Sequence, residues 1–377
     1  MTCETVLTNS RLVLPDAVMH GTLVIRGTLI ADVQPGRSAL PAALDLAEDI
    51  LIPGAVDLHT DNLERQVQPR SNARWPSRSA MIAHDAQCAA AGVTTVLDAF
   101  CLGDLSFDKD RIRTFHEGVA DLDALSDAGL LRAEHFLHLR CEIPSPDMLR
   151  LFDAVSDHHR TRMVSLMDHT PGVGQYADLD RYRSLRRQGG MPQQEIERRI
   201  TELQAARARL RGPNRRALLD RMTGRRVALA SHDDRTAAEI AENAGDGIRV
   251  SEFPVTLEAA LAAREAGMQV IAGAPNIVRG GSHSGNVSAG ELLCNEAIDA
   301  FASDYVPPSL IEAAFQIARQ ISLASAIALI SDNPAHIAGL GDRGRITPGK
   351  RADLVRVRVH DNLAVVRQVW RAGERVA

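Results

Sequence analysis

The sequence has 377 residues and a formal net charge of -5, with 45% hydrophobic and 24% charged residues. That length suits one large domain with a smaller accessory domain, and the mild negative charge gives no reason to expect nucleic acid or an anionic membrane as a partner. No signal pattern or bilayer-length apolar run is present, and the five cysteines lack any C-x-x-C pair, so we expect a cytoplasmic protein with reduced thiols.

The two ends of the chain show patterns typical of short antiparallel strands. Residues 5–32 and 346–377 alternate β-branched runs with turn residues, which is the signature of hairpins in a small sheet. Because these strand-rich ends flank a helix-rich middle, we predict that residues 1–51 and 341–377 come together as one small β-domain. Two separate edge extensions are the alternative.

Between these ends, residues 52–340 alternate apolar strand-like runs with helical patterns. Eight near-continuous apolar runs separated by helices are what a (β/α)8 barrel requires. We therefore predict an α/β fold in which a TIM (β/α)8 barrel carries the small β-rich domain formed by both termini. The eight runs are ILIPGAVDLH, VTTVLDAF, EHFLHLRCE, MVSLMDH, VALASHDD, IRVSEFP, MQVIAGAP and AIDAFASDY.

One segment interrupts this alternation. Residues 181–226 carry 14 arginines against four acidic residues, and Pro192 stands where proline commonly opens a helix. We predict a helical insertion at about 176–224, between two barrel strands. A solvated helical face is the favoured role for its arginines; binding of a polyanion or a partner protein is the alternative, although only Tyr182 offers an aromatic ring for stacking.

Polar side chains end several of the predicted barrel strands. His59 and Asp61 are two residues apart, so both side chains can project to the same side of a strand. The C-terminal strand ends of a TIM barrel meet on one face, and imidazole with carboxylate is a ligand set for zinc, manganese or iron. The sequence therefore predicts a site for one or two divalent ions, with zinc expected and manganese or iron as alternatives. The predicted metal ligands are His59, Asp61, Glu142, His169, His232 and Asp304.

Two other histidines are predicted to be structural. His84 lies with Asp85 in the helix-like run SAMIAHDAQCAAAG. His138 is expected to be a strand residue that points away from the site.

These motifs resemble the amidohydrolase superfamily. PGAVDLHTD followed by AGVTTVLDAF is similar to its opening, and SDYVP to its closing aspartate segment. Over essentially the whole chain, HTDNLERQVQPR, RWP, MDHTPG, ASHDD, EFPVTLEAA and GAPNIVRGGSHSGNVSA resemble the PhnM family of the carbon–phosphorus lyase pathway. The resemblance implies hydrolysis of α-D-ribose 1-methylphosphonate 5-triphosphate with release of pyrophosphate, a step of phosphonate catabolism.

The chain departs from the superfamily pattern at the first strand and at the bridging ligand. The first strand of the superfamily usually ends His-x-His, whereas here it ends His-x-Asp. Two-metal members often bridge their ions with a carboxylated lysine, but neither Lys109 nor Lys350 ends a central strand. We therefore expect Glu142 to bridge the ions, with an ion pair to Arg140 as its alternative role.

Glu252 stands where the superfamily commonly has a histidine. It either joins the metal ligands or orients one of them from behind, and we favour the second role.

A triphosphate that also carries a phosphonate brings several negative charges, and arginine binds phosphate oxygens bidentately. The glycine-rich loop at 276–285 would let backbone amides approach an anion closely. Asp304 is the expected general acid/base, because a carboxylate there can accept the proton of the attacking water. The predicted substrate-binding residues are Arg70, Arg74, Arg140, Arg279, Ser282 and His283.

Two other functions are consistent with the sequence. A deacylase, dihydroorotase or deaminase on the same fold would act on an amide or cyclic amide, and it would not need arginines around the mouth. A non-catalytic scaffold subunit would not need to keep the ligand set. We favour a phosphorylated small molecule as the partner, with no nucleic acid or membrane; a homo-oligomer is compatible with the sequence.

Overall fold

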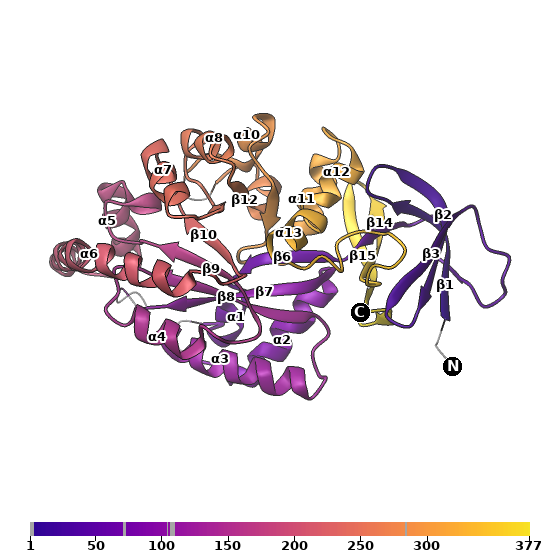
Figure 1. The fold of residues 1–377 in the computed structure, drawn as a ribbon, viewed down its shortest axis with the longest axis horizontal. Coiled ribbons are helices and arrows are strands. Elements are labelled where there is room, and N and C mark those ends of the chain that lie inside the picture. Colours follow the sequence, from indigo (N-terminus) through magenta and orange to yellow (C-terminus); the bar gives the residue numbers. More distant parts are fainter. Residues whose placement is uncertain (1–3, 71–72, 104, 106–109, 283–284) are drawn as a thin grey trace.

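The computed structural model describes residues 4–70, 73–103, 105, 110–282 and 285–377. Two eight-stranded sheets organise these residues (Figure 1). One is a parallel sheet surrounded by helices, and the other is a mostly antiparallel sheet that contains both ends of the chain.

The parallel sheet confirms the predicted TIM barrel, because each of the eight apolar runs overlaps one of its strands. Every strand pairs with its neighbour in chain order, and a bridge between Thr60 and Asp304 links the last strand end to the first. The strands are β6 (Ala55–Thr60), β7 (Val93–Leu102), β8 (Glu134–Glu142), β9 (Thr161–Met167), β10 (Ala228–His232), β11 (Val250–Glu252), β12 (Gln269–Gly273) and β13 (Ala300–Ala302).

Burial on both faces explains why these strands read as continuous apolar runs. Strand β7 is buried at every position. Inside the barrel, Val56, Leu97, Met163 and Ile271 belong to one core, which residues of α13 (Asp332–Ile337) join. The interior is therefore packed with side chains, and the space for a site is left at the strand ends.

Helices cover the outside of the barrel (Figure 1). None of those in the described part of the chain is long and apolar enough to cross a membrane. They are α1 (Asn62–Val67), α2 (Ser77–Ala90), α3 (Asp110–Asp127), α4 (Met148–Val155), α7 (Ala237–Gly245), α8 (Leu257–Glu265), α9 (Ala274–Val278), α10 (Ala289–Cys294), α11 (Ser309–Ile317) and α12 (Leu323–Ala328).

Between β9 and β10 the chain forms a 3-10 turn, η1 (Gly174–Tyr176), and two helices, α5 (Leu179–Gln188) and α6 (Gln193–Met222). These helices fall within the segment predicted as an insertion. They share a small core of their own in which Tyr182 is only 1% exposed. The one ring that the sequence offered for stacking is thus buried, which removes the aromatic support for nucleic-acid binding.

The second sheet unites the two ends of the chain, so the alternative of separate edge extensions is wrong. Its order is β16-β15-β14-β5-β1-β2-β3, with β4 paired to β1. The first apolar run divides at Gly54: the part before it joins this sheet, and the part after it opens the barrel. The strands are β1 (Glu4–Val13), β2 (Val18–Arg26), β3 (Leu29–Pro35), β4 (Leu44–Asp45), β5 (Ile50–Pro53), β14 (Leu354–His360), β15 (Leu363–Arg371) and β16 (Glu374–Arg375).

Candidate metal centre

A cavity of about 560 Å³ lies at the C-terminal ends of the barrel strands. All six predicted metal ligands line it. Because the strands run in chain order around the barrel, Glu142 ends the third strand, His169 follows the fourth and His232 ends the fifth. Residues far apart in the sequence are thereby brought to this end of the barrel, which we call the mouth.

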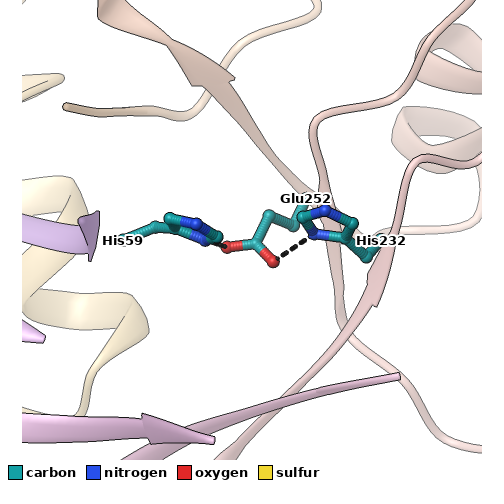
Figure 2. Close-up of side chains that lie close together, drawn as sticks. All are labelled: His59, His232 and Glu252. Carbon is teal, nitrogen blue, oxygen red and sulfur yellow. Dashed lines mark hydrogen bonds and ion pairs between the residues drawn. The ribbon is translucent and has the colours of Figure 1, made fainter. Parts of the chain in front are cut away.

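Glu252 links two of the histidines from below the cavity. Its two carboxylate oxygens accept hydrogen bonds from Nδ1 of His59 (2.8 Å) and Nδ1 of His232 (2.7 Å), as Figure 2 shows. The side chain is fully buried, and the two rings lie nearly parallel with centroids 5.9 Å apart. Burial alone would lower the pKa of His59, but the charge of Glu252 reverses this and raises that pKa to about 10. Glu252 thus fixes the orientation of both rings.

The opposite ring edges, at Nε2, face carboxylates at longer range. His59 Nε2 lies 3.7 Å from Asp61 Oδ1, and Asp304 completes this group of three donors within 4.8 Å of one another. His169 Nε2 and His232 Nε2 each lie 3.7 Å from Asp233 Oδ2. The mouth therefore holds two neighbouring donor groups, each with imidazole and carboxylate.

Within the described part of the chain, both carboxylate oxygens of Glu142 are hydrogen-bonded by His169. Its Oε1 accepts from the backbone N–H of His169 (2.8 Å), and its Oε2 accepts from Nδ1 of the same residue (2.6 Å). Arg140 instead pairs with Asp61 at 2.6 Å, so the alternative Glu142–Arg140 ion pair does not form. Among the described residues, Glu142 belongs to none of the groups of three candidate donors.

Three residues just beyond strand ends adopt the left-handed backbone conformation. Asp233, Phe253 and Asp304 have φ values of 58°, 55° and 58°, which cost L-residues about 1–2 kcal/mol each. The N–H of Asp304 donates to the carbonyl of His59, and the N–H of Asp61 donates to the carbonyl of Asp304. This tight backbone connection brings Asp61 and Asp304 together across the ends of the first and last strands.

The electrostatics of Asp304 suit a group that takes up and releases a proton. Burial raises the pKa of its carboxyl to about 6, and the nearby charge of Asp61 adds to the increase. Such a carboxyl accepts a proton more readily than an ordinary aspartate does.

The donor chemistry fits divalent metal ions. The three mouth histidines all donate Nδ1–H to a carboxylate, which leaves Nε2 as the edge toward the cavity; this carboxylate–histidine arrangement is common behind metal-ligating imidazoles. Asp233 Oδ2 is buried, and the described residues offer it no hydrogen-bond partner. A divalent cation would satisfy this oxygen, so the site is compatible with bound metal.

Three arginines line the cavity, each from a different element. Arg140 comes from β8, Arg111 from α3, where it lies 3.1 Å from Glu64, and Arg186 from α5 of the insertion. Arg186 lies over the rings of Tyr176 and Tyr182. The insertion therefore forms part of the wall of the cavity.

The structure brings only some of the predicted substrate-binding residues to the cavity. Arg140 and Ser282 line it. Arg70 and Arg279 are exposed, and Arg74 pairs with Glu117 at 2.8 Å. These three arginines are not among the described residues that line the cavity, so their part in substrate binding stays a prediction. His283 lies outside the described residues.

His138 was expected to point away from the site, and this was wrong. It is fully buried inside the barrel, and its ring centroid lies 5.1 Å from that of His59. Its Nδ1 lies 3.1 Å from the carbonyl of Leu58 and its Nε2 2.9 Å from Oγ of Ser165. Burial lowers the pKa of His138 to about 3, so this residue is a neutral support beneath the mouth.

His84 belongs to a second, fully buried group. Its Nε2 donates to Asp98 (2.7 Å), and its Nδ1 lies 2.9 Å from the amide of Asn62. His135 contacts Asp98 (2.8 Å) and Asp85 (3.2 Å) through its two ring nitrogens. The predicted structural role of His84 is consistent with this closed network.

Several cavity residues were not proposed from the sequence. Asp233 directly follows His232, so its position after a strand was the available signal. Arg111, Tyr176 and Arg186 sit on helices and turns, and no spacing pattern in the sequence points from these elements to the mouth.

This barrel, with its clustered histidines and carboxylates at the strand ends, is similar to the amidohydrolases, a class of metal-dependent hydrolases. The amidohydrolase family model matches residues 288–377. Solved structures agree on the fold: N-isopropylammelide isopropylaminohydrolase from Burkholderia multivorans (TM-score 0.62, 18% identity, 100% of this chain and 98% of that chain) and N-acetylglucosamine-6-phosphate deacetylase from Thermotoga maritima (TM-score 0.64, 15% identity, 99% of each chain).

A curated relative narrows the class. The chain is 42% identical over 377 residues to alpha-D-ribose 1-methylphosphonate 5-triphosphate diphosphatase of Escherichia coli, a match that covers 98% of this chain and 100% of the relative. The chain belongs to the family of this diphosphatase.

Proposed function

We propose that the chain hydrolyses α-D-ribose 1-methylphosphonate 5-triphosphate and releases diphosphate. The observation that carries the proposal is the full-length similarity to a diphosphatase of that name. The cavity supports it, because three arginines stand beside the candidate metal centre, and a substrate with this many negative charges needs cationic partners.

The proposed metal ligands are His59, Asp61 and Asp304 in one group and His169 with His232 in the other, for one or two divalent ions, with zinc expected and manganese or iron as alternatives. When bound, such ions supply Lewis acidity and lower the pKa of water. Glu252 holds the rings of His59 and His232 in the orientation that presents Nε2 to the cavity.

Asp304 is the proposed general acid/base. In the proposed reaction, water oxygen bonds to the phosphorus nearest the ribose, and the anhydride bond to the outer two phosphates breaks. The carboxylate of Asp304 accepts the proton of the water and returns it to the departing diphosphate.

Arg111, Arg140 and Arg186 are the proposed partners of the phosphate oxygens. Arg140 is anchored by Asp61 at 2.6 Å, so it sits beside the reacting end of the cavity. Arg186 stands on the opposite, inserted element, where it would meet a part of the substrate remote from the strand ends. Ser282 lines the cavity and offers a hydroxyl to the same anion.

The proposal is tested by supplying the purified protein with the ribose triphosphate phosphonate and, separately, with a cyclic amide, after reconstitution with Zn²⁺ or Mn²⁺. Stoichiometric release of diphosphate from the first compound is the expected result. Hydrolysis of the amide alone would favour the deacylase or dihydroorotase alternative, and no metal uptake with no turnover would favour the scaffold alternative.

We also propose that the protein works in the cytoplasm. Cys88, Cys101, Cys141 and Cys294 are all unpaired thiols, as expected in a reducing compartment.

A further inference from the structure

We propose that Asp233 is a metal ligand, and that its carboxylate, in place of that of Glu142, completes the donor set of His169 and His232. The inference rests on the proposed function only in that the mouth holds divalent metal. It does not depend on which substrate is hydrolysed.

The position of Asp233 follows from the end of β10. The residue comes directly after His232 and takes a left-handed backbone conformation with φ 58°. Its Oδ2 lies 3.7 Å from Nε2 of His169 and 3.7 Å from Nε2 of His232. Ligand atoms around one tetrahedral zinc ion are roughly 3.4 Å apart, so both distances to Asp233 Oδ2 are close to what a shared ion requires, and all three donor atoms lie within 4.8 Å of one another.

The environment of Asp233 Oδ2 suits a cation. This oxygen is buried and finds no hydrogen-bond donor within the described part of the chain, a costly condition for a carboxylate. The next residue shows the contrast: Asp234 accepts hydrogen bonds from Ser231 (2.5 Å), Ser251 (2.6 Å) and Asn243 (2.8 Å). The carboxylate of Asp234 is thus hydrogen-bonded by the protein, whereas Oδ2 of Asp233 faces the Nε2 edges of two histidines.

Glu142 occupies a different place in the same group. Both of its oxygens already accept hydrogen bonds from His169, one from the backbone and one from Nδ1. It therefore orients His169 from behind, as Glu252 orients the other two rings. With Glu142 engaged in this way and no lysine at a strand end, Asp233 is the carboxylate left to complete this donor group.

The test measures metal binding without substrate. Wild type, Asp233→Asn and Glu142→Gln are stripped with a chelator and reconstituted with Zn²⁺. Bound Zn²⁺ per chain is measured by plasma mass spectrometry, and affinity by competition with a chromophoric chelator. Asparagine keeps the left-handed backbone accessible while removing the anionic ligand. Asp168→Asn is the matched control, because Asp168 flanks His169 and is also 12% exposed but pairs with Arg207.

We expect Asp233→Asn to lose about one Zn²⁺ per chain or to bind the more weakly held ion at least tenfold less tightly, and Asp168→Asn to match wild type. Glu142→Gln should keep the wild-type number of ions with weaker binding, since loss of a carboxylate that orients a ligating histidine costs roughly 10–100-fold in affinity. Co²⁺-substituted Asp233→Asn should also show an altered visible absorption spectrum.

Wild-type stoichiometry and affinity in both Asp233→Asn and Asp233→Ala would overturn the proposal. So would loss of an ion in Glu142→Gln with none in the Asp233 variants, which would make Glu142 the ligand, or a wild-type protein that retains no Zn²⁺. Circular dichroism on each variant excludes unfolding as the cause. Absence of diphosphate release with an intact Asp233 effect would reject the proposed substrate and leave this inference standing.

Discussion

Two groups of histidines and carboxylates lie in this barrel, and they differ in how the ring nitrogens are used. In the buried group, His84 and His135 each have both nitrogens within hydrogen-bond distance of a protein partner. In the mouth group, His59, His169 and His232 each give Nδ1 to a glutamate, and the carboxylates nearest Nε2 lie 3.7 Å away.

The comparison separates a structural cluster from a candidate metal centre. Among the described residues, the buried group is one set of three donors within 4.8 Å of one another and the mouth group contains three such sets, so proximity alone does not distinguish them. A network in which both nitrogens are satisfied stabilises the fold, whereas rings satisfied on one edge only are prepared for a ligand. Changes in the mouth group should therefore affect activity and metal binding, and changes in the buried group should affect stability.

The largest expected effect is on catalysis. Replacing Asp304 with asparagine removes the proposed proton acceptor, and asparagine tolerates the positive φ at this position. We expect kcat to fall roughly 10²–10⁴-fold, the usual contribution of general acid–base catalysis. A steady-state assay of diphosphate release checks this, and turnover at the wild-type rate would remove Asp304 from the mechanism.

The second effect is on stability. Asp98 accepts hydrogen bonds from both His84 and His135 and is 1% exposed. Asp98→Asn removes the buried carboxylate that His84 and His135 share and leaves the protonated His135 with Asp85 alone among its described partners, so we expect the free energy of unfolding to fall by about 3–5 kcal/mol. Urea unfolding measures the change. Metal content should remain that of the wild type. Loss of metal from this variant would contradict the conclusion that the buried group has a structural role only.

The third effect is on metal affinity. Glu252→Gln weakens the hold on the rings of His59 and His232, so we expect Zn²⁺ to bind roughly 10–100-fold less tightly. Chelator competition measures this. Glu265→Gln, at an exposed position at the end of α8, is the control and should bind Zn²⁺ as the wild type does.

The fourth effect concerns the substrate. Arg186→Ala removes a cation from the cavity wall, and a hydrogen bond to a charged group contributes about 1.5–3 kcal/mol, so KM should rise roughly tenfold or more. Arg187→Ala is the matched control, because Arg187 is exposed on the same helix and does not line the cavity. Equal KM values for the two variants would exclude Arg186 from substrate binding.

The smallest effect is a pH dependence of stability. Burial opposes protonation of His135, but the charge of Asp98 outweighs it and raises the pKa to about 9. Since the folded pKa exceeds the unfolded value of about 6.5, this contribution is complete below pH 6.5 and is lost as the pH rises through 9. Between pH 7 and 8 we expect a loss of about 1 kcal/mol. The measurement is urea unfolding at both pH values, and His135→Gln should lack that component.

Much of the fold follows from sequence pattern. Each of the eight apolar runs overlaps a barrel strand because strands buried on both faces need uninterrupted apolar residues. The division at Gly54 was not predicted, since two consecutive strands of different sheets read as one apolar run. A side chain there would clash with Thr94, because a Cβ on Gly54 would lie 2.2 Å from its Oγ1.

The site was predictable where a candidate ligand lies at the end of a strand or within two residues after it. All six ligands predicted from the sequence line the cavity for this reason. The arginines were less predictable, because Arg70 and Arg279 lie in loops whose paths no local pattern sets, whereas Arg186 reaches the mouth through packing of the insertion. Which ring nitrogen of each histidine is hydrogen-bonded depends on contacts between residues far apart in the sequence, such as Glu252 with His59. No local sequence pattern predicts such contacts.

The barrel has a seam where its last strand meets its first. There the strands are joined by the Thr60–Asp304 bridge, and the neighbouring backbone hydrogen bonds run between His59, Asp61 and Asp304. The candidate ligands His59 and Asp61 stand on one side of this seam and Asp304 on the other. An ion bound by all three residues would cross-link the ends of the first and last strands. Metal binding would therefore slow unfolding of the barrel in addition to its part in catalysis.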